Sequence, residues 1–341
     1  MEKTGIYLKA ILLVLLTGQI WTAMAAERGR ITGGVPHEVP GWFKDSFLEI
    51  ADDVDEASEQ GKHVLLFFQL NNCPYCDRML EEAFEAEPLT SYIQQHFDAI
   101  AINMLGDRDI AFKEKISVTE KELSEILKVR VTPAILFLDE NNKTVARVNG
   151  YRAPERFRLV LEYVATKSYQ TTKLADYMQA KLDRNVYQLR PNRLFSDIRD
   201  LSSVDGPLLL IFEDGSCYDC VAFHDGVLAH ELVRKDIEPF TIVRLDADSD
   251  KTIIDVMGNE TTAAALAREH EMIYRPGVLV FDKGVLVRRH NNLIYPIYFK
   301  EIMRYVAGGF YKQIDYWAYL EQRTEELLAA GVVIDLGRPK P

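Results

Sequence analysis

Two runs of consecutive apolar residues, each followed by a pair of cysteines, dominate the pattern of hydrophobic and polar positions along the chain. The runs are 64–68 and 208–212, and the cysteines that follow them are Cys73, Cys76, Cys217 and Cys220. Apolar runs of this length, bounded by polar residues, are typical of strands buried on both faces. The chain has 4 cysteines in all. Because every one belongs to a Cys-x-x-Cys pair, their use favours paired redox chemistry over packing.

Alternating helical and strand patterns continue through the first half of the chain. The predicted elements are, in order, a helix over 46–59, the strand 64–68, a helix that starts at the first cysteine pair, a strand over 97–104, a helix opened by a capping box of Thr119 and Glu122, strands over 131–138 and 145–148, and a helix over 154–165. This is the element order of a thioredoxin fold, a mixed α/β fold with one central sheet flanked by helices.

The second half repeats the first, element by element. Cys217 follows Cys73 by 144 positions, Pro276 follows Pro133 by 143, and the two closing helices align with an offset of 142. Offsets that drift by only two residues indicate a tandem duplication. We expect residues 194–201 to supply the leading helix of the second copy. The predicted fold class is therefore α/β, with two tandem thioredoxin-like domains, each a mixed central sheet flanked by helices.

The start of the chain has the layout of a secretory signal. Lys3 and Lys9 accompany an apolar stretch over 10–20, and Ala23-Met24-Ala25 fits a cleavage site, so we expect cleavage before Ala26. An uncleaved anchor is the alternative, but the apolar stretch is shorter than the ~20 residues that a membrane span needs. The predicted organisation is a signal peptide over 1–25, a first unit over 26–168, a helical linker over 169–183, a second unit over 184–311, and a C-terminal helix and tail over 312–341.

Charge and composition narrow the classes of partner. The chain carries a net charge of −12 and is 48% hydrophobic, so it can bury substantial cores but does not attract polyanions. We therefore expect neither nucleic acid nor anionic membrane surfaces as partners. No other stretch is long and apolar enough to cross a bilayer, so we expect no stable membrane insertion after signal cleavage. A disulfide-permissive compartment outside the cytoplasm is the predicted location.

The spacing of the first cysteine pair predicts its chemistry. Two thiols two residues apart at a helix start can close a small disulfide ring, and the positive end of the helix stabilises a thiolate on the first. Cys73 is the predicted nucleophile. Cys76, one turn into the helix, is the predicted resolving thiol that attacks the mixed disulfide and releases the substrate. We expect no cofactor and no metal.

The first unit resembles the SoxW-type periplasmic thioredoxin-related proteins. The residues that show this are Leu66-Phe67-Phe68, Cys73-Pro74-Tyr75-Cys76, 102–108, Val131-Thr132-Pro133 and Gly150-Tyr151. The resemblance implies thiol:disulfide exchange with protein substrates in the periplasm and electrons from a membrane thiol transporter of the CcdA type. It also implies a cis-proline at Pro133 facing the cysteines. A cis X-Pro bond turns the chain sharply, so Thr132 is expected to present its backbone to an extended substrate.

The second site departs from the first. Arg275 and Pro276 stand where the first unit has Thr132 and Pro133, and acidic residues surround the second pair, namely Glu213, Asp214 and Asp219. Negative charge disfavours a thiolate, which predicts a more reducing second pair, whereas the cation of Arg275 acts in the opposite direction. Our hypothesis is that the two units differ in potential and exchange electrons. The alternative is a structural or slow second disulfide.

The sequence leaves alternatives for the group that accepts the proton and for the direction of disulfide exchange. Ordinary thioredoxins carry a buried acid six residues before the first cysteine, but this chain has Phe67 and Ile211 there, so water or another group, such as Glu213, must accept the proton. A disulfide reductase is the preferred function. The alternatives are an oxidase or isomerase, a redox-gated chaperone, and a metal-binding module built on Cys217, Cys220 and His224, with His230 nearby.

Overall fold

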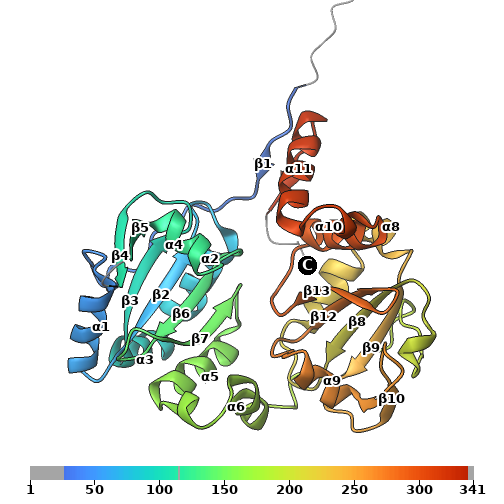
Figure 1. The fold of residues 1–341 in the computed structure, drawn as a ribbon, viewed down its shortest axis with the longest axis horizontal. Helices are drawn as coiled ribbons and strands as arrows, with labels where there is room; N and C mark the ends of the chain where they lie inside the picture. The colour runs from blue at the N-terminus through green and yellow to red at the C-terminus, as the bar shows by residue number, and fades with distance from the viewer. Residues whose placement is uncertain (1–26, 114–115, 337–341) are drawn as a thin grey trace, which may run out of the picture.

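The computed structural model describes residues 27–113 and 116–336, so the predicted signal peptide lies outside the described residues. Two α/β units lie side by side, each with a four-stranded sheet at its centre (Figure 1). Within the described ranges, no helix has the length and apolar character needed to cross a bilayer.

The sheet of the first unit has the strand order β3-β2-β6-β7. Its strands are β2 (His63–Gln69), β3 (Phe97–Asn103), β6 (Ala134–Leu138) and β7 (Thr144–Asn149). β2 and β3 are parallel, whereas β6 is antiparallel to both β2 and β7. Helices cover both faces, which explains why the apolar run of β2 is buried along nearly its whole length. The helices are α1 (Ile50–Glu59), α2 (Pro74–Met79) with a π-helical continuation (Leu80–Phe84), α3 (Leu89–His96), α4 (Glu120–Ile126) and α5 (Pro154–Ala165).

The second unit has the same topology. Its strands are β8 (Pro207–Glu213), β9 (Thr241–Asp246), β12 (Gly277–Asp282) and β13 (Val285–His290), in the order β9-β8-β12-β13 and with the same parallel and antiparallel pairings. Its helices are α7 (Cys220–Ala222) with a π-helical continuation (Phe223–Leu228), α8 (Glu231–Ile237), α9 (Ala263–Glu269) and α10 (Pro296–Ala307). The predicted fold class, two tandem thioredoxin-like domains, is confirmed.

The repeat extends one helix beyond each closing helix. α6 (Leu174–Lys181) follows α5, and α11 (Tyr316–Ala329) follows α10 at the same offset of 142 positions. A tyrosine of each closing helix fixes the connection, because the Tyr163 hydroxyl donates to Thr172 O at 2.7 Å and the Tyr305 hydroxyl donates to Ile314 O at 2.6 Å. The helix expected in the linker and the terminal helix are therefore corresponding parts of the two copies.

One expectation about local structure is wrong. Residues 194–201 form no α-helix, and a 3₁₀ turn (Leu201–Ser203) is the only helical element before β8 in this part of the described chain. Leu194 and Phe195 instead pack on the second core from a turn that Phe195 N closes on Asn192 O at 3.1 Å, and Ser196 N donates to Ile242 O at 2.8 Å. The polar stretches after β3 and β9 contain short hairpins, β4 (Asp109–Lys113) with β5 (Ile116–Thr119) and β10 (Thr252–Ile254) with β11 (Glu260–Thr262). The capping box of Thr119 and Glu122 is confirmed.

Two buried arginines of the first unit insert into the second unit. Arg156, at 1% exposure, donates to Ile273 O at 3.0 Å and to the carbonyl and hydroxyl of Ser216 at 3.1 and 2.9 Å. Arg152 donates to Asn291 O at 2.6 Å and lies over the ring of Tyr274 at 4.8 Å. Burial lowers the pKa of each guanidinium to about 10, so both remain charged at neutral pH, with carbonyl oxygens as their partners.

The ends of the described chain also join the two units. β1 (Ile31–Thr32), which precedes the first unit, pairs in parallel with β14 (Ile334–Asp335), which follows α11. The segment that contains β1 runs beside α11 (Figure 1). A buried polar contact and a strand pairing therefore hold the units together at separate places.

Replacing Arg156 with methionine tests the buried contact. The variant Arg156→Met keeps the length of the side chain but leaves Ile273 O and Ser216 O without their donors, so we expect a loss of about 1–3 kcal/mol in the free energy of unfolding. Arg158→Met is the control, because Arg158 lies exposed on the same helix and pairs only with Glu162; its expected change is within about 0.5 kcal/mol. Urea unfolding followed by circular dichroism measures both, and equal values for the two variants would contradict the interface role.

Candidate functional site

Cys73 lies at the start of helix α2 and forms a disulfide with Cys76. Its backbone is extended, and its Sγ accepts a hydrogen bond from the N–H of Cys76 at 3.1 Å. Pro74 favours a helix start here, because the first helical position needs no N–H and the ring already has helical φ. In the reduced form the free N–H groups and the positive helix end stabilise a thiolate on Cys73.

Thr132 and Pro133 lie beside the first pair. The Thr132–Pro133 bond is cis, and Thr132 Oγ1 is 3.4 Å from Cys73 Sγ. A cavity of about 340 Å³ opens at Cys73, and its walls are largely apolar. Both units form these walls, the first through Leu70, Met104 and Val131 and the second through Leu293, Tyr298 and Trp317. A substrate that reaches Cys73 through this cavity therefore contacts both units.

The second pair, Cys217 and Cys220, also forms a disulfide, but its helix begins later. α7 starts at Cys220 with Asp219 as its N-cap, so Cys217 precedes the helix by three residues and lacks the helix-start position that Cys73 has. Tyr218 occupies the position of the proline in the first pair. The exposure of the first cysteine falls from 7% in the first unit to 2% in the second.

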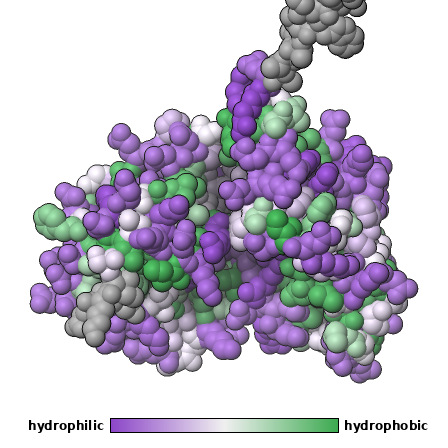
Figure 2. All heavy atoms as spheres, turned by 45° about the horizontal axis from the view of Figure 1, so that its top comes forward, coloured by the Kyte–Doolittle hydropathy of each residue, from purple (hydrophilic) through white to green (hydrophobic). Residues whose placement is uncertain are grey.

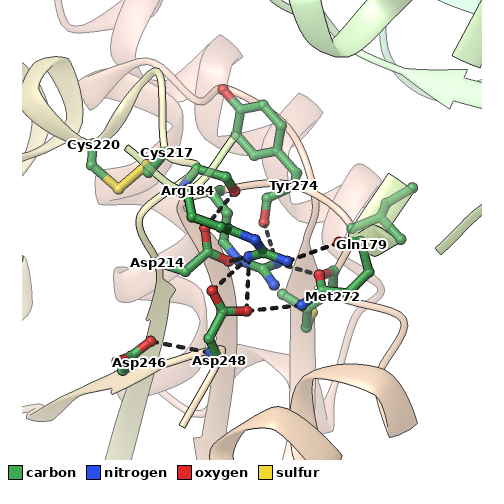
Figure 3. A network of polar contacts seen from close by, with 12 residues as sticks. Gln179, Arg184, Asp214, Cys217, Cys220, Asp246, Asp248, Met272 and Tyr274 are labelled. Carbon is green, nitrogen blue, oxygen red and sulfur yellow. Dashed lines mark hydrogen bonds and ion pairs between the residues drawn. A yellow bond between two sulfur atoms is a disulfide. The ribbon is translucent and has the colours of Figure 1, made fainter. Parts of the chain in front are cut away.

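A segment at the start of the second unit, residues 184–187, covers the loop before Cys217. Two of its backbone N–H groups donate to Gly215 O, both at 2.9 Å. A Cβ on Gly215 would lie 2.1 Å from Arg184 O, so only glycine allows this close passage. Figure 3 shows Arg184 beside Asp248, with the second disulfide nearby. Arg184 Nη1 lies 2.6 Å from Asp248 Oδ2, and Nη2 donates to Gln179 O at 3.0 Å.

Tyr187 closes the cover over the second disulfide. It packs with Cys217, Cys220 and Leu189 in one small buried cluster. Access to the second disulfide therefore requires the covering segment to move. Sequence reasoning missed this cover, because residues 184–187 show no strand or helix pattern.

Charged partners compensate Asp214, the nearest acid before Cys217. Arg275 Nε lies 2.5 Å from Asp214 Oδ2, and Arg184 Nη1 lies 3.5 Å from the same oxygen. Burial raises the pKa of Asp214, but the Arg275 guanidinium and the Ser216 donors outweigh burial and bring the pKa below its usual range. Arg275, the residue before cis-Pro276, therefore pairs with this carboxylate and does not supply a free cation.

The other two acids of the second site are also bonded. Burial raises the pKa of Asp219, which accepts a hydrogen bond from the Tyr274 hydroxyl at 2.6 Å. Glu213 is fully buried and lies 2.6 Å from His224 Nε2. Counting acids in the sequence therefore overstates the negative charge that acts on Cys217, because each carboxylate has a specific partner.

The tautomer of His224 follows from its neighbours. Asn192 accepts from Leu194 N with its oxygen, so its amide nitrogen faces His224 Nδ1, at 3.2 Å. Nδ1 is then the acceptor, and Nε2–H donates to Glu213. The Tyr187 hydroxyl lies 3.3 Å from Glu213 and 3.4 Å from His224 Nε2. Tyr187 thus connects a buried Glu–His pair to the second cysteines.

This arrangement bears on the metal alternative. With Nε2 directed to Glu213 and Nδ1 to Asn192, both ring nitrogens of His224 already have partners. His230 Nδ1 accepts from Leu232 N at 3.2 Å and caps α8. In residues 27–113 and 116–336 no group of three or more potential ligands meets at one point.

The tyrosine in each cysteine pair packs against the other unit. The ring of Tyr75 stacks on Tyr295 with centroids 3.9 Å apart and an interplanar angle of 16°. Tyr218 packs against the core of the first unit. Both cysteine loops therefore lie at the boundary between the units.

Sequence reasoning missed the arginines at this boundary, although a signal was present. With the closing helices aligned, Arg152 and Arg156 occupy the positions of Ile294 and Tyr298 in the second copy. An arginine in one copy where the other has an apolar or aromatic residue suggests a buried cation with a special partner.

Replacing Gly215 with alanine tests the cover over the second disulfide. Gly215→Ala places a Cβ against Arg184 O and should displace the covering segment. We expect reduction of Cys217–Cys220 to become about tenfold faster, since a local opening made easier by about 1.4 kcal/mol has that effect. The first pair should keep its rate. The measurement is timed phosphine reduction of the full-length protein, alkylation and mass spectrometry of each pair.

Gly206→Ala is the matched control for this prediction, because a Cβ there meets nothing within 4 Å. It should react as the unmodified protein does. If Gly215→Ala leaves the second pair as slow as the control does, then the covering segment does not limit access.

Comparisons with known proteins support the fold of the first unit. Residues 50–165 match the model of the thioredoxin-like domain family. No curated protein matches the chain. Similar solved structures include a thioredoxin-fold protein from Helicobacter pylori, 29% identical over 36% of this chain and 84% of that chain, with a TM-score of 0.33.

Two further solved structures match a comparable share of the chain. A thioredoxin from Thermus thermophilus is 20% identical over 35% of this chain and 85% of its own, with a TM-score of 0.29. The C-terminal domain of DsbD from Neisseria meningitidis, in its oxidised form, is 14% identical over 34% and 90%, with a TM-score of 0.25. On the family match, residues 50–165 form a thioredoxin-like domain.

Proposed function

We propose that this protein is a periplasmic thiol:disulfide oxidoreductase that reduces disulfides of exported proteins through Cys73 and Cys76. The observation that carries the proposal is the position of Cys73. Its sulfur lies at a helix start, accepts a backbone N–H, contacts Thr132 beside a cis-proline, and borders a cavity. This combination of a stabilised thiolate and an access route suits an attacking thiol.

The reaction proceeds in two exchanges. The Cys73 thiolate attacks one sulfur of the client disulfide, which forms a mixed disulfide and releases the other client sulfur as a thiolate. Cys76 then attacks Cys73 Sγ, which releases the second client thiolate and leaves the Cys73–Cys76 disulfide. Two electrons pass to the client. Thr132, next to cis-Pro133, is placed to bond the backbone of the client on the way.

The second pair has a different role in this proposal. Cys217 lacks a helix start, is 2% exposed and lies under Tyr187 and the segment 184–187. These features favour a structural or slow disulfide over a second site of client exchange. An internal relay, in which the second pair passes electrons to the first, is the other candidate, and it is favoured by the position of both cysteine loops at the boundary between the units.

The proposed location of the protein, its electron donor and the direction of electron flow rest on the sequence. The signal layout of residues 1–25 supports export, and the resemblance to SoxW-type proteins supports a reductase fed by a membrane thiol transporter of the CcdA type. An oxidase, an isomerase and a redox-gated chaperone remain alternatives to this proposal. Retained client binding after loss of all exchange would favour the chaperone.

Cysteine variants of the full-length protein test which pair exchanges with clients. Cys73→Ser should lower the turnover of a disulfide-containing peptide, with dithiothreitol as reductant, by more than about 100-fold, because no other thiol borders the cavity as Cys73 does. Cys76→Ser should accumulate a mixed disulfide with the peptide, seen by mass spectrometry. Cys217→Ser combined with Cys220→Ser should retain most of the turnover. A double variant as inactive as Cys73→Ser would contradict exchange by the first unit alone.

Redox titration tests the direction of electron flow. Each pair is followed separately by differential alkylation and mass spectrometry across graded dithiothreitol buffers. A reductase should show a Cys73–Cys76 transition near about −270 mV, whereas a value near about −120 mV would identify an oxidant. A lower potential for Cys217–Cys220 would support the internal relay. A second pair that never titrates would identify a structural disulfide.

A further inference from the structure

A second and larger cavity, of about 1010 Å³, lies between the two units. Its walls include residues of β7 and β13, which are the edge strands of their sheets and face each other across the boundary (Figure 1). Helix α9 and the start of α6 complete the walls. Figure 2 shows a hollow between the units, with hydrophilic residues along its rim. We call this cavity the interdomain cleft.

The interdomain cleft is basic although the protein as a whole is acidic. Eight lysines and arginines line it, against three acidic residues, in a chain with a net charge of −12. Within the described ranges, only one of the eight cations has a carboxylate partner, namely Arg289, which lies 3.4 Å from Glu271. Positive charge gathered in a concave site draws anions toward it. The cleft therefore holds cations that no carboxylate of the described chain neutralises, and it can attract an anionic ligand.

Arg288 and His290, in the wall of the cleft, each have a side-chain nitrogen without a hydrogen-bond partner among the described residues. Arg288 lies over the ring of Tyr316 at 4.1 Å, and its Nε has no hydrogen-bond partner among the described residues. Burial, together with the charge of Arg288, lowers the pKa of His290 to about 3. The imidazole is therefore neutral at ordinary pH, and its Nε2 also lacks a partner in the described part of the chain. Both unpartnered nitrogens are buried atoms in the wall of the cleft.

The interdomain cleft adjoins the cavity at Cys73. Four residues line both spaces, namely Arg130, Val131, His290 and Trp317. Val131 directly precedes Thr132, whose Oγ1 lies 3.4 Å from Cys73 Sγ. A chain bound in the cleft therefore lies next to the cavity that Cys73 borders.

We infer that the interdomain cleft binds an acidic, extended segment of the client polypeptide, next to the disulfide that Cys73 attacks. This inference rests on the proposed function and names its substrate class. The volume lies at the upper end of the roughly 300–1,000 Å³ range of small-ligand sites, and the cations are spread over both units and do not converge on one point. That distribution fits a chain with several carboxylates better than a single small anion. The edge strands offer backbone groups to an extended guest.

Peptide binding to the full-length protein tests the inference separately from the chemistry. The probes are three rhodamine-labelled peptides of one length, with their cysteines replaced by serine, that carry four glutamates, four glutamines or four lysines. Anisotropy at low salt should show the glutamate peptide binding at least about tenfold more tightly than the glutamine peptide. Its affinity should fall with added salt, which shortens the range of exposed charges to about 10 Å at 0.1 M.

Charge variants then localise the binding. Lys173→Gln combined with Arg268→Gln removes two cleft cations that have no carboxylate partner in the described chain, and should weaken the glutamate peptide about tenfold without affecting the glutamine peptide. Arg234→Gln combined with Lys235→Gln is the control. It makes the same charge change on the exposed residues of α8, outside the cleft, and should leave both affinities within about twofold.

Three results would overturn the inference. They are equal affinity for the glutamate and glutamine peptides, an equal loss in the control variant, and displacement of the peptide by inorganic phosphate at matched ionic strength, which would indicate a small-anion site. Exchange assays with the cysteine forms of the same peptides separate this inference from the proposed function. Disulfide exchange without a preference for the acidic peptide would refute only the proposed binding in the cleft. Selective binding of the acidic peptide without exchange would refute only the proposed reductase activity.

Discussion

A buried guanidinium needs fixed acceptors for its donors, and among the described residues Arg156 bonds its two terminal nitrogens to acceptors of the other unit. Its partners are Ser216, directly before Cys217, and Ile273, just before the loop of cis-Pro276. Hydrogen bonds of this kind tolerate little displacement. They therefore fix the first unit against the two loops that form the second cysteine site. The stacking of Tyr75 on Tyr295 does the converse for the first site. Each cysteine loop is consequently shaped by its own unit and bounded by the other.

The two copies keep one backbone topology and differ in a few side chains that decide the chemistry. Pro74 favours a helix start at Cys73, whereas Tyr218 in the same position accompanies a later start at Cys220. By sheet register, Gln69 and Glu213 occupy equivalent ends of β2 and β8. Glu213 is hydrogen-bonded to His224 and Tyr187, because a buried carboxylate needs partners. The second site has thus acquired a buried polar network and a cover, while the first keeps an open approach.

The fold was predictable from the sequence because strand burial, capping and the repeat offset are local or periodic signals. The apolar run of β2, the capping box of Thr119 and the helix over 154–165 all appear as predicted. The leading helix of the second unit did not, since Leu194 and Phe195 pack on the core from a turn that is stabilised by Asn192. The contacts between the units could not be predicted from the sequence, for a different reason. They join residues far apart in sequence, whose pairing depends on how the units pack, and no local pattern encodes that packing.

Access to Cys73 places a constraint on clients that charge alone does not. Cys73 is 7% exposed and borders a cavity of about 340 Å³ with walls from both units, a space that holds a few side chains and no folded surface. A disulfide on a rigid globular client cannot bring its sulfur to Cys73 while the units keep this arrangement. On the proposed function, the protein therefore acts on disulfides in extended or unfolded segments, or the units must separate first. Separation would break the Arg156 hydrogen bonds and the stack of Tyr75 on Tyr295 together, and it would expose the apolar surface that both units bury at the boundary. The geometry accordingly favours narrow, extended clients, selected by access before any electron moves.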